Sequence, residues 1–330
     1  MIAGTTDRKI DKLIHLLVKN ATVVVPGPKI ASEIGVTRST VWMWIEQLRG
    51  LGVQIKGVPS KGYQLAKLPD ILAPSLIRPE LGEIEMGHRL VHYFRVDSTN
   101  NIALSLAQEG APHGTVVVAE EQTAGRGRFG RGWYSEKSSG IYTSVILRPP
   151  LSPAAAPAIT LMAGLAAHRA LSASTGLEFD IRWPNDLLVN GRKVCGILTE
   201  MSAELDRLHS VVLGIGINVN HREMSSELAP IATSLGIEAG KTFSRVNILV
   251  ALLRELDRQY RVLLAEGTEP IVRQWAAASS FAEGKRVRVV VNSGDYKGTT
   301  AGLEASGALR LRRDDGGEVS LVSGEVVEIK

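Results

Sequence analysis

A run of alternating glycines and arginines is the first feature of this 330-residue chain whose residue types suit chemistry. Residues 125–133 have the sequence GRGRFGRGW, in which the glycines allow the backbone to approach a ligand closely. Arg126, Arg128 and Arg131 supply permanent positive charge in a geometry that fits phosphate or carboxylate, and Trp133 offers a face for stacking. Taken alone, the run equally fits a floppy surface loop or an RNA-binding loop of the arginine-glycine kind. Its place between two strands of buried type favours a ligand loop.

A second candidate is the segment RWPNDLLVNGRKVCGIL. The Asn-Gly pair at residues 190–191 lies between two apolar runs and is a strong hairpin signal. We therefore expect the strand that carries Lys193 to fold back on the strand that follows Asn185 and Asp186, so that an amide, a carboxylate and an ammonium group converge. Lys193 alternates with Cys195, which predicts a small side chain beside the lysine. From spacing alone, an ordinary hairpin with exposed charges is the favoured alternative.

Two further segments carry weaker signals. In LGIGINVN, residues 213–220, every odd position is apolar and the even positions are Gly, Gly, Asn and Asn. Glycines weaken a strand, so close approach of a ligand is one reason for them; a strand packed under a helix is the other. The cluster DSTN, residues 97–100, precedes a helical pattern, and plain helix capping is the favoured explanation for it.

Composition excludes several classes of protein. The chain is 44% hydrophobic and 22% charged, which is typical of a globular protein with two domains, possibly three. A single cysteine cannot form an internal disulfide, which predicts a reducing, cytoplasmic address. We expect no signal peptide and no membrane span, because the most apolar stretch, residues 154–167, is interrupted by Pro157, Thr160 and Gly164. The seven histidines show no paired spacing, so a dedicated metal site is not expected, and no P-loop or nucleophile-elbow pattern occurs.

The positive charge of the chain is concentrated near the N-terminus. Residues 1–66 contain nine Lys and Arg but four Asp and Glu, which suggests that this part meets a polyanion. Helical spacing over residues 8–19 and 28–35 precedes a third helix that Thr37 would cap and that would bury Val41, Ile45 and Leu48. Two short strands around the turn at residues 59–62 complete the pattern of a winged helix-turn-helix.

In that motif the third helix enters the major groove and the wing lies near phosphates. Trp42 and Trp44 are two positions apart and cannot both face the core. A basic three-helix module that binds protein is the alternative. The predicted DNA-binding residues are Arg38, Ser39, Thr40, Trp42, Lys56 and Lys61.

The elements that must position the candidate residues define a multidomain α+β protein. Residues 67–82 contain three prolines without a clean period and indicate a link between domains. Strand and helix patterns then alternate, which predicts a mixed α/β domain. Five short strands after residue 281 predict a small β-barrel, whose favoured role is packing or partner binding. The predicted domains are residues 1–66, 67–280 and 281–330.

This combination resembles the bifunctional biotin protein ligases, or biotin operon repressors, of bacteria. GRGRFGRGW is similar to the family's G-R-G-R-x-G-x-x-W loop, and RWPNDLLVNGRKVCGIL is similar to its K-W-P-N-D-(x)n-R-K-x-x-G-I-L segment. GIGINVN and DSTN also match, and the resemblance covers essentially the whole chain. In one departure, Arg182 stands where the family has a lysine. Phe129 and Gly132 stand where some relatives have basic residues.

The resemblance implies a central domain of the class II synthetase-like, biotin/lipoate ligase type. It implies two half-reactions: biotin and ATP give biotinyl-5′-AMP and pyrophosphate, and a lysine of the biotin carboxyl carrier protein of acetyl-CoA carboxylase then accepts the biotin. The expected ligands are ATP, biotin and Mg²⁺, and the expected partners are the carrier protein, operator DNA and a second copy of the chain when the adenylate is bound. No membrane partner is expected.

The resemblance also implies roles for individual residues, since attack at phosphorus needs positioning and charge neutralisation. The catalytic residues would be Lys193, Arg128 and Arg126. The biotin-binding residues would be Ser98, Thr99, Asn100, Gln122, Gly125, Arg126, Gly127, Arg128, Lys193, Gly196 and Gly214. The ATP- or adenylate-binding residues would be Arg128, Arg131, Trp133, Asn185, Asp186 and Asn218.

Three alternatives stay open. In the first, the chain is a ligase that has lost repression. In the second, it is a catalytically dead repressor that senses biotin. In the third, it is a lipoate- or octanoyl-type ligase of the related fold. The presence of Arg126, Arg128 and Lys193 disfavours the dead repressor, and the DNA-binding module and the RWPND segment disfavour the lipoate-type ligase.

Overall fold

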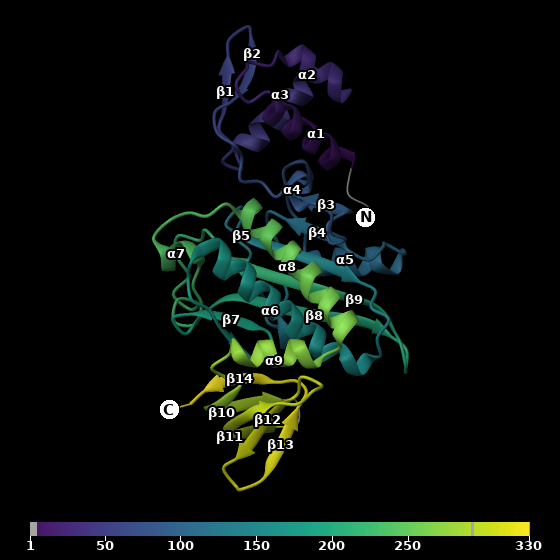
Figure 1. Cartoon of the computed structure of the whole chain (residues 1–330). Coiled ribbons are helices and arrows are strands. Elements are labelled where there is room, and N and C mark those ends of the chain that lie inside the picture. The colour runs from purple at the N-terminus through teal and green to yellow at the C-terminus, as the bar shows by residue number, and fades with distance from the viewer. Residues whose placement is uncertain (1–4, 292–293, 330) are drawn as a thin grey trace.

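The computed structural model describes residues 5–291 and 294–329 of the chain. Its elements form three bodies stacked in sequence order: a small helical body, a large sheet covered by helices and a small sheet (Figure 1). The three sheets have two, seven and five strands. The multidomain α+β architecture expected from the sequence is therefore the one observed.

The N-terminal body has the predicted three helices and hairpin. Gly35 ends the second helix with a positive φ of 74°, and Thr37 caps the third by accepting a hydrogen bond from the Thr40 amide at 3.2 Å. Trp44 is buried in this body, whereas Trp42 is 59% exposed, as their spacing required. The elements are α1 (Thr5–Lys19), α2 (Gly27–Ile34), α3 (Arg38–Arg49), β1 (Ile55–Val58) and β2 (Gly62–Leu65).

The segment that links this body to the next is more regular than predicted. Residues 67–82 were expected to be irregular, but α4 (Pro74–Leu81) forms within them. Pro74 lies in the first turn, where no amide hydrogen is needed. Ile77 and Leu81, one turn apart, are both buried. Burial of one face therefore supports a helix that the prolines concealed in the sequence.

A buried charge cluster anchors the same link in the core of the central body. The Arg245 side chain is 1% exposed and pairs with Asp70 at 3.1 Å and with Glu120 at 2.8 Å. Glu120 also accepts a hydrogen bond from the Leu72 amide at 2.7 Å. Burial opposes ionisation of Glu120, but Arg245 and His92 outweigh it and lower its pKa to about 2. Residues 70–72 are thus fixed to the central sheet by charge.

The central sheet has the strand order β3-β4-β5-β9-β8-β7-β6. Only β3 and β4 pair in parallel, and every other neighbouring pair is antiparallel. The long hairpin of β8 and β9 forms its middle. The strands are β3 (Leu90–Tyr93), β4 (Thr115–Ala119), β5 (Gly140–Leu147), β6 (Asp180–Arg182), β7 (Asp186–Val189), β8 (Arg192–Ala203) and β9 (Leu208–Asn218).

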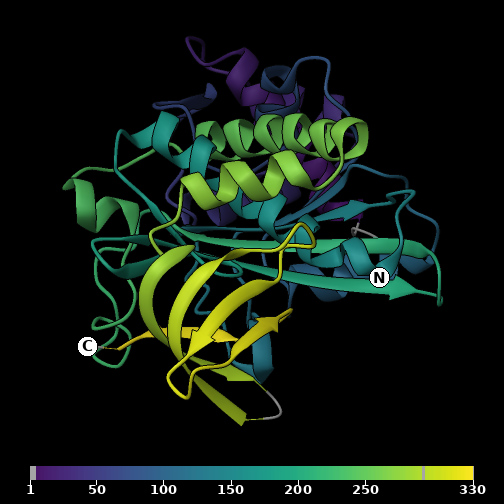
Figure 2. The ribbon, with the colours of Figure 1, turned by 60° about the horizontal axis from the view of Figure 1, so that its bottom comes forward.

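The two faces of this sheet are covered differently. Leu213 and Ile215 of β9 belong to the main core with α6 (Ala156–Thr175), α8 (Arg245–Glu266) and α9 (Glu269–Ala277). Figure 2 shows α8 and α9 beside each other on that side. Val212 points the other way, into a smaller cluster with α5 (Thr99–Gln108). Because neighbouring residues of a strand face opposite sides, Gly214 and Gly216 lie on the side of α5.

The apolar helix α6 corrects one expectation. With the short 3₁₀ turn η2 (Pro153–Ala155) it forms a 23-residue helix, Pro153–Thr175, with mean hydropathy 1.2, long and apolar enough to cross a membrane by composition. The expectation that Pro157, Thr160 and Gly164 interrupt this apolar stretch is wrong, because all three lie within the one helix. In the fold, 61% of the helix's most apolar window is buried inside the protein. Packing against the sheet, α8 and α9 accounts for its composition.

Two other local predictions fail. Residues 179–189 were expected to form one strand but form β6 and β7, which pair with each other. Pro184 lies between them and has no amide hydrogen for a ladder, and the Trp183–Pro184 peptide is cis. A short helix, α7 (Leu235–Ala239), was not predicted; the Ser234 side chain caps it by accepting from the Ile237 amide at 3.1 Å.

The C-terminal body has the five predicted strands but is not a closed barrel. Its order is β13-β12-β11-β10-β14, and no ladder joins its edge strands. Only residues 322–324 separate β13 from β14, so the two edges lie within about 14 Å and the sheet is strongly curled without closing. The strands are β10 (Glu283–Val291), β11 (Gly294–Leu303), β12 (Leu309–Arg313), β13 (Glu318–Leu321) and β14 (Glu325–Glu328).

Candidate active site

The glycine-arginine run folds into a closed turn rather than a floppy loop. The Trp133 amide donates to the Gly125 carbonyl at 2.8 Å, and the Gly127 amide donates to the Arg131 carbonyl at 2.7 Å. Residues 128–130 form the short turn η1 (Arg128–Gly130), in which Phe129 has a φ of 55°. A Cβ on Gly125 would lie 2.6 Å from the Trp133 carbonyl oxygen, so this position requires glycine. The folded backbone of this turn therefore fixes the positions of the Cα atoms of the three arginines.

Each arginine of this turn has a partner on a different element. The Nη2 of Arg126 contacts both carboxylate oxygens of Glu200, at 2.8 and 3.1 Å. Arg128 Nη1 donates to Asn185 Oδ1 at 3.2 Å and to the Gly324 carbonyl at 3.0 Å. Burial lowers the pKa of Arg128, but an arginine stays cationic. The turn thus directs fixed positive charge toward β7 and β8.

Arg131 is tied to the C-terminal sheet. It makes a two-point ion pair with Glu325 of β14, with both N···O distances at 2.5 Å. Its hydrogen bond with Glu325 raises the Arg131 pKa. Together with the contact between Arg128 and Gly324, this pair makes the C-terminal sheet part of the site. Its expected role as a packing or partner-binding appendage is therefore incomplete.

The predicted hairpin brings its polar groups together. Asn190 and Gly191 have positive φ values of 49° and 75°, and β7 pairs with β8. Asp186 lies between two cations, 2.6 Å from Lys193 Nζ and 2.8 Å from Arg182 Nη2. Burial opposes ionisation of Asp186, but Lys193 and Arg182 outweigh it and lower its pKa. The arginine that departs from the family pattern thus helps to neutralise Asp186.

The register of the hairpin changes the neighbour of Lys193. A bulge separates the pairs Leu187–Cys195 and Leu188–Lys193, so the simple alternation of β8 is broken. Cys195 is fully buried, and burial raises its pKa to about 12. A Cβ on Gly196 would lie 2.8 Å from Lys193 Cε. Gly196, rather than Cys195, is therefore the small residue that makes room for the lysine.

The bare face of β9 is covered by two side chains of the site. A Cβ on Gly216 would overlap the indole of Trp133, and one on Gly214 would overlap the Asn100 carboxamide. Lys193 Nζ lies 5.2 Å from the centre of the Trp133 ring. The Trp133 Nε1 atom is buried against Gly216 and has no hydrogen-bond partner among the described residues.

The start of α5 forms a polar pocket on the same face. Ser98 holds the N-cap position, but its side chain makes no capping hydrogen bond. Instead, the Thr99 amide and hydroxyl approach Gln122 Oε1 at 2.8 and 3.1 Å. Gln122 Nε2 donates to Ser135 Oγ at 2.8 Å. Plain capping, the favoured explanation for DSTN, does not account for these bonds.

Asn218 is placed differently from the other predicted residues. Its Nδ2 donates to the Thr233 carbonyl at 3.0 Å, and the residue is buried. Thr233 in turn donates its amide to the Lys193 carbonyl at 2.9 Å. Asn218 therefore fixes the segment before α7 against the strand of Lys193, and a direct contact with a nucleotide stays a prediction.

The sequence did not indicate several residues that the fold adds to this group. Glu200 and Ser144 join Arg126 to the polar pocket through Asn100, and Ser135 and Glu325 hold Gln122 and Arg131. Single acidic or hydroxyl residues within strands have no spacing signal of their own. Of these four residues, a search for charged residues on the α5 side of β8 would have found Glu200 alone.

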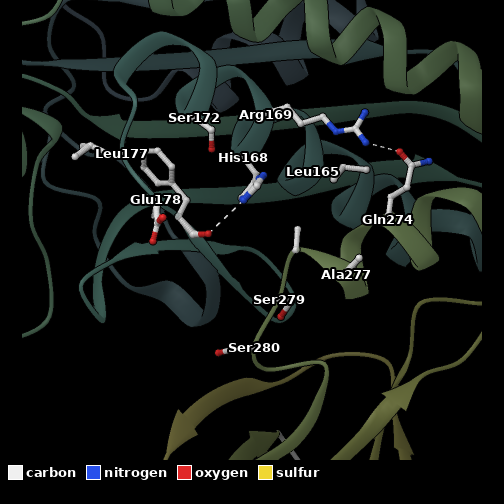
Figure 3. Close-up of a pocket in the computed structure, with 12 residues that line it drawn as sticks. Leu165, His168, Arg169, Ser172, Leu177, Glu178, Gln274, Ala277, Ser279 and Ser280 are labelled. Atoms are coloured by element: carbon white, nitrogen blue, oxygen red, sulfur yellow. Dashed lines mark hydrogen bonds between the residues drawn. The ribbon is translucent and has the colours of Figure 1, made fainter.

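Two cavities lie near or beyond this site. One, of about 560 Å³, opens beside Arg128 between Pro157, Pro184, Met201 and Val322, and is largely apolar. The other lies between α6 and α9 (Figure 3). Two of its polar residues are already paired, His168 with the Phe179 carbonyl and Arg169 with Gln274. The shallow cavity in Figure 3 holds none of the convergent cations, so the chemistry belongs to the site around Lys193.

The predicted DNA-binding residues lie together on the N-terminal body. Arg38, Ser39 and Trp42 are exposed on α3, and Thr40 is partly exposed because its hydroxyl contacts Thr37 at 2.8 Å. Met43, beside Trp42, is also exposed. Lys56 and Lys61 are exposed on the β1–β2 hairpin. Three cations, Arg38, Lys56 and Lys61, and two large apolar side chains, Trp42 and Met43, are therefore exposed on this body.

Taken together, the site can hold an anion between Arg126, Arg128 and Lys193 and a polar head group at Thr99 and Gln122. Among the described residues, no group of three or more His, Cys, Asp or Glu side chains is arranged to hold a metal ion. Asp186, the carboxylate nearest the cations, is already neutralised by Arg182 and Lys193. The arrangement favours charge neutralisation over acid–base or metal-centred chemistry.

Comparisons with known proteins match each of the three parts of the chain. The model of the biotin/lipoate A/B protein ligase family matches residues 93–218. A helix-turn-helix domain model matches residues 9–64, and the biotin protein ligase C terminal domain model matches residues 284–327.

Similar proteins span nearly the same length. The bifunctional ligase/repressor BirA of Bacillus subtilis is 39% identical over 306 residues, which cover 92% of this chain and 94% of that protein. The Escherichia coli protein of the same name is 31% identical over 91% of this chain and 93% of its own length. The solved biotin protein ligase from Aquifex aeolicus in complex with biotin and ATP has a TM-score of 0.63 and 29% identity, covering 73% of this chain and 98% of that one.

Proposed function

Because this chain belongs to the biotin/lipoate A/B protein ligase family, we propose that it is an ATP-dependent biotin protein ligase that also represses transcription. In the first half-reaction an oxygen of the biotin carboxylate attacks the α-phosphorus of ATP, and the bond to the β-phosphate oxygen breaks. Biotinyl-5′-AMP and pyrophosphate result. In the second, a lysine amine of the acceptor attacks the carbonyl of the mixed anhydride, AMP leaves and the amine loses a proton. One arrangement carries this proposal: Arg128 contacts Asn185, Lys193 contacts the adjacent Asp186, and Arg126 contacts Glu200, which Asn100 joins to the polar pocket.

The three cations have complementary tasks. Two anions, the carboxylate and the α-phosphate, must approach each other, and their repulsion is the main obstacle. Arg126 and Arg128 hold the carboxylate and phosphate in the attacking geometry, and Lys193 follows the oxygens on which charge grows. Asp186 orients the ammonium group of Lys193 at 2.6 Å. Such preorganised charge is the largest contribution available in a site without a general base.

The remaining site residues bind the two ends of the substrates. Ser98, Thr99, Asn100 and Gln122 form the pocket for the polar head of biotin, and Gly125, Gly127, Gly196 and Gly214 approach the ligand with their backbone. A Cβ on Gly125, Gly196 or Gly214 would displace Gln122, Lys193 or Asn100. Trp133 covers the ligand. Arg131, Asn185, Asp186 and Asn218 bind or order the nucleotide.

Mg²⁺ is proposed to arrive with the phosphates of ATP. The carboxylates of the described residues near the proposed nucleotide site, Asp186, Glu200 and Glu325, are each already paired with a lysine or an arginine. This donor set does not fit a separate protein-bound ion, since Mg²⁺ prefers several oxygen ligands. Bound to ATP, the ion supplies charge neutralisation on the phosphates.

A test of substrate class separates this proposal from a lipoate- or octanoyl-type ligase. Each acid is supplied alone and in competition with ATP, and transfer to its own carrier domain is followed by mass spectrometry. We expect transfer of biotin, unaffected by an excess of lipoate. Transfer of lipoate or octanoate at a comparable rate would place the chain in the other class.

A test of the closed site uses Gly216. Replacing it by alanine pushes a methyl group into the Trp133 ring. Overpacking of this kind costs about 1–3 kcal/mol of stability, so we expect Tm to fall by a few degrees and, because the Trp133 ring is displaced, kcat/KM for biotin to fall about tenfold in the folded protein. Gly317→Ala, where the atom nearest to a Cβ is 3.7 Å away, is the matched control. Wild-type kinetics in Gly216→Ala would contradict the placement of Trp133 over β9.

The N-terminal body is proposed to bind operator DNA, with α3 in the major groove and Lys56 and Lys61 near phosphates. In this account the chain binds as a homodimer when the adenylate is present, in the cytoplasm, and its carrier partner is that of acetyl-CoA carboxylase. Residues 1–66, 67–280 and 281–330 are the proposed domain boundaries. A ligase without repression and a biotin-sensing repressor without ligation remain the alternatives.

Trp42 provides the test of DNA reading. A duplex selected by the wild-type protein from a random pool is titrated in the presence of biotin and ATP. We expect Trp42→Ala to weaken binding about tenfold with an unchanged salt slope, because apolar contacts read bases. Lys56→Ala should weaken binding on all sequences and lower the slope by about one. Equal affinity of Trp42→Ala and wild type would exclude α3 as the reading element.

A further inference from the structure

A carboxylate lies inside a site whose substrates are anions. Glu200 is on β8, two residues beyond Leu198, on the side of the sheet that faces α5. Its side chain is 26% exposed and contacts Arg126 Nη2 through both oxygens, at 2.8 and 3.1 Å. A fixed negative charge here opposes binding of a carboxylate or a phosphate. Its presence therefore needs an explanation beyond electrostatic attraction of the substrate.

The geometry of the pair supplies one. Both Glu200 oxygens use the same nitrogen of Arg126, and the described residues make no other hydrogen bond with that guanidinium. A guanidinium has five N–H donors in a rigid plane. The two paired edges of a guanidinium, Nε–Nη2 and Nη1–Nη2, both include Nη2, so a carboxylate on Nη2 leaves the Nε and Nη1 hydrogens as separate donors for oxyanions. Glu200 thus fixes the position of the Arg126 guanidinium without using its Nε and Nη1 donors.

Glu200 is itself held from the opposite side. Its Oε2 accepts a hydrogen bond from Asn100 Nδ2 at 2.7 Å. Asn100 Oδ1 accepts from Ser144 Oγ at 2.5 Å, and Ser144 lies 2.8 Å from the Thr99 hydroxyl. Asn100 and Ser144 are buried. The carboxylate therefore belongs to a connected polar chain that ends in the pocket proposed for the head of biotin.

Both polar atoms of the Asn100 carboxamide are already hydrogen-bonded within this series of polar residues. Its amide nitrogen is engaged by Glu200 and its oxygen by Ser144, and Gly214 lacks the Cβ that would displace it. Such an asparagine orients a neighbour more directly than it binds a substrate. The same contacts explain why a glycine is required at the start of the bare face of β9.

We propose that Glu200 is a positioning residue for the first half-reaction, which holds the Arg126 guanidinium so that its Nε and Nη1 donors face the reacting carboxylate and phosphate oxygens. The inference rests on the proposed ligase function. Because the pair is neutral overall, it adds little to ground-state attraction of biotin. Its benefit appears when charge grows on the oxygens and the fixed N–H donors need no reorganisation. Losing Glu200 should therefore lower kcat rather than raise KM.

The test is Glu200→Gln, which keeps the length of the side chain but removes its charge. Initial rates of biotin-dependent pyrophosphate release give kcat and KM. We expect kcat to fall about tenfold, since misplacement of a positioned group has effects of this order or larger, while KM for biotin stays within about twofold of wild type or falls. Glu204→Gln is the matched control, because Glu204 is 73% exposed and pairs with His209 outside the site.

A double-mutant cycle separates positioning from a structural role. In the Arg126→Ala background, Glu200→Gln should change kcat less than twofold, because there is no guanidinium left to position. An undiminished loss in that background, an unchanged kcat in the single variant, or a raised KM with kcat preserved would each overturn the proposal. Absence of pyrophosphate release by the wild-type protein is a different result, and it would remove the ligase function itself.

Discussion

Lys193→Ala is expected to slow formation of the biotinyl adenylate by about 100- to 1,000-fold, the range found when one preorganised charge-stabilising group is removed. Lys193 lies at the meeting point of the site, 2.6 Å from Asp186 and 5.2 Å from the centre of the Trp133 ring. Its backbone is fixed on both sides, because its amide donates to the Ile231 carbonyl and its carbonyl accepts from the Thr233 amide, both at 2.9 Å.

The loss is chemical rather than structural. Arg182 still pairs with Asp186 at 2.8 Å in the variant, so the carboxylate keeps a partner, and Lys193 is partly exposed at 28%. Single-turnover pyrophosphate release measures the adenylation rate directly, with Tm as the check on folding. Lys241→Ala, which removes an ammonium 5.3 Å from the Phe243 ring, is the control. A Lys193→Ala rate within threefold of wild type would show that charge at this atom is not needed.

Arg128→Ala should lower kcat/KM by about 100-fold, with both substrates affected. Of the three loop arginines, Arg128 alone joins the central and C-terminal sheets. It contacts Asn185, the residue before β7, at 3.2 Å and the carbonyl of Gly324, the residue before β14, at 3.0 Å. Without it, the phosphate loses a cation and two elements lose a shared contact. Arg288→Ala is a suitable control, because Arg288 lies on β10 and pairs with Asp295 at 3.6 Å.

Arg128→Lys separates the two contributions. It restores the charge but not the planar fork, so we expect it to recover binding of ATP more fully than kcat. If Arg128→Ala lowered Tm by several degrees and the remaining folded protein had full activity, the residue would be a domain contact only. Rates and unfolding curves are therefore recorded on the same preparations.

The parts of the site that depend on local pattern were predictable from the sequence. The Asn-Gly pair fixed the β7–β8 hairpin, and with it the approach of Lys193 to Asp186. Alternation along residues 213–220 correctly put the glycines of β9 on one face. These features follow from turn geometry and the two-residue period of a strand, which act over a few residues.

What the sequence concealed depends on contacts between distant segments. Glu200 and Arg126 are 74 residues apart in the sequence, and Glu325 and Arg131 are 194 apart, so no local pattern predicts either pair. The bulge that puts Gly196 rather than Cys195 beside Lys193 is a one-residue shift in register. Whether the C-terminal sheet closes depends on pairing between β13 and β14, which five strand patterns cannot specify.

The composition of α6 misleads in a different way. Its uncharged run is long and apolar enough to span a membrane, but in the fold most of it is buried against other helices and the sheet. Leu161, Met162 and Leu165 are each at most 1% exposed, since α6 lies between the sheet and the pair α8 and α9. Composition records burial, but it does not say whether lipid or protein surrounds the helix.

The central claim is that one site makes a biotinyl adenylate and passes its biotin to a carrier lysine. The most direct measurement loads the protein with biotin, ATP and Mg²⁺, removes free nucleotide, and then adds an unmodified carrier domain. We predict biotin-dependent pyrophosphate release during loading and, after the carrier is added, transfer of about one biotin per protein with release of AMP. Tight binding of biotin without pyrophosphate release, or no transfer after the nucleotide is removed, would contradict the account and leave a biotin-binding protein with a DNA-binding module.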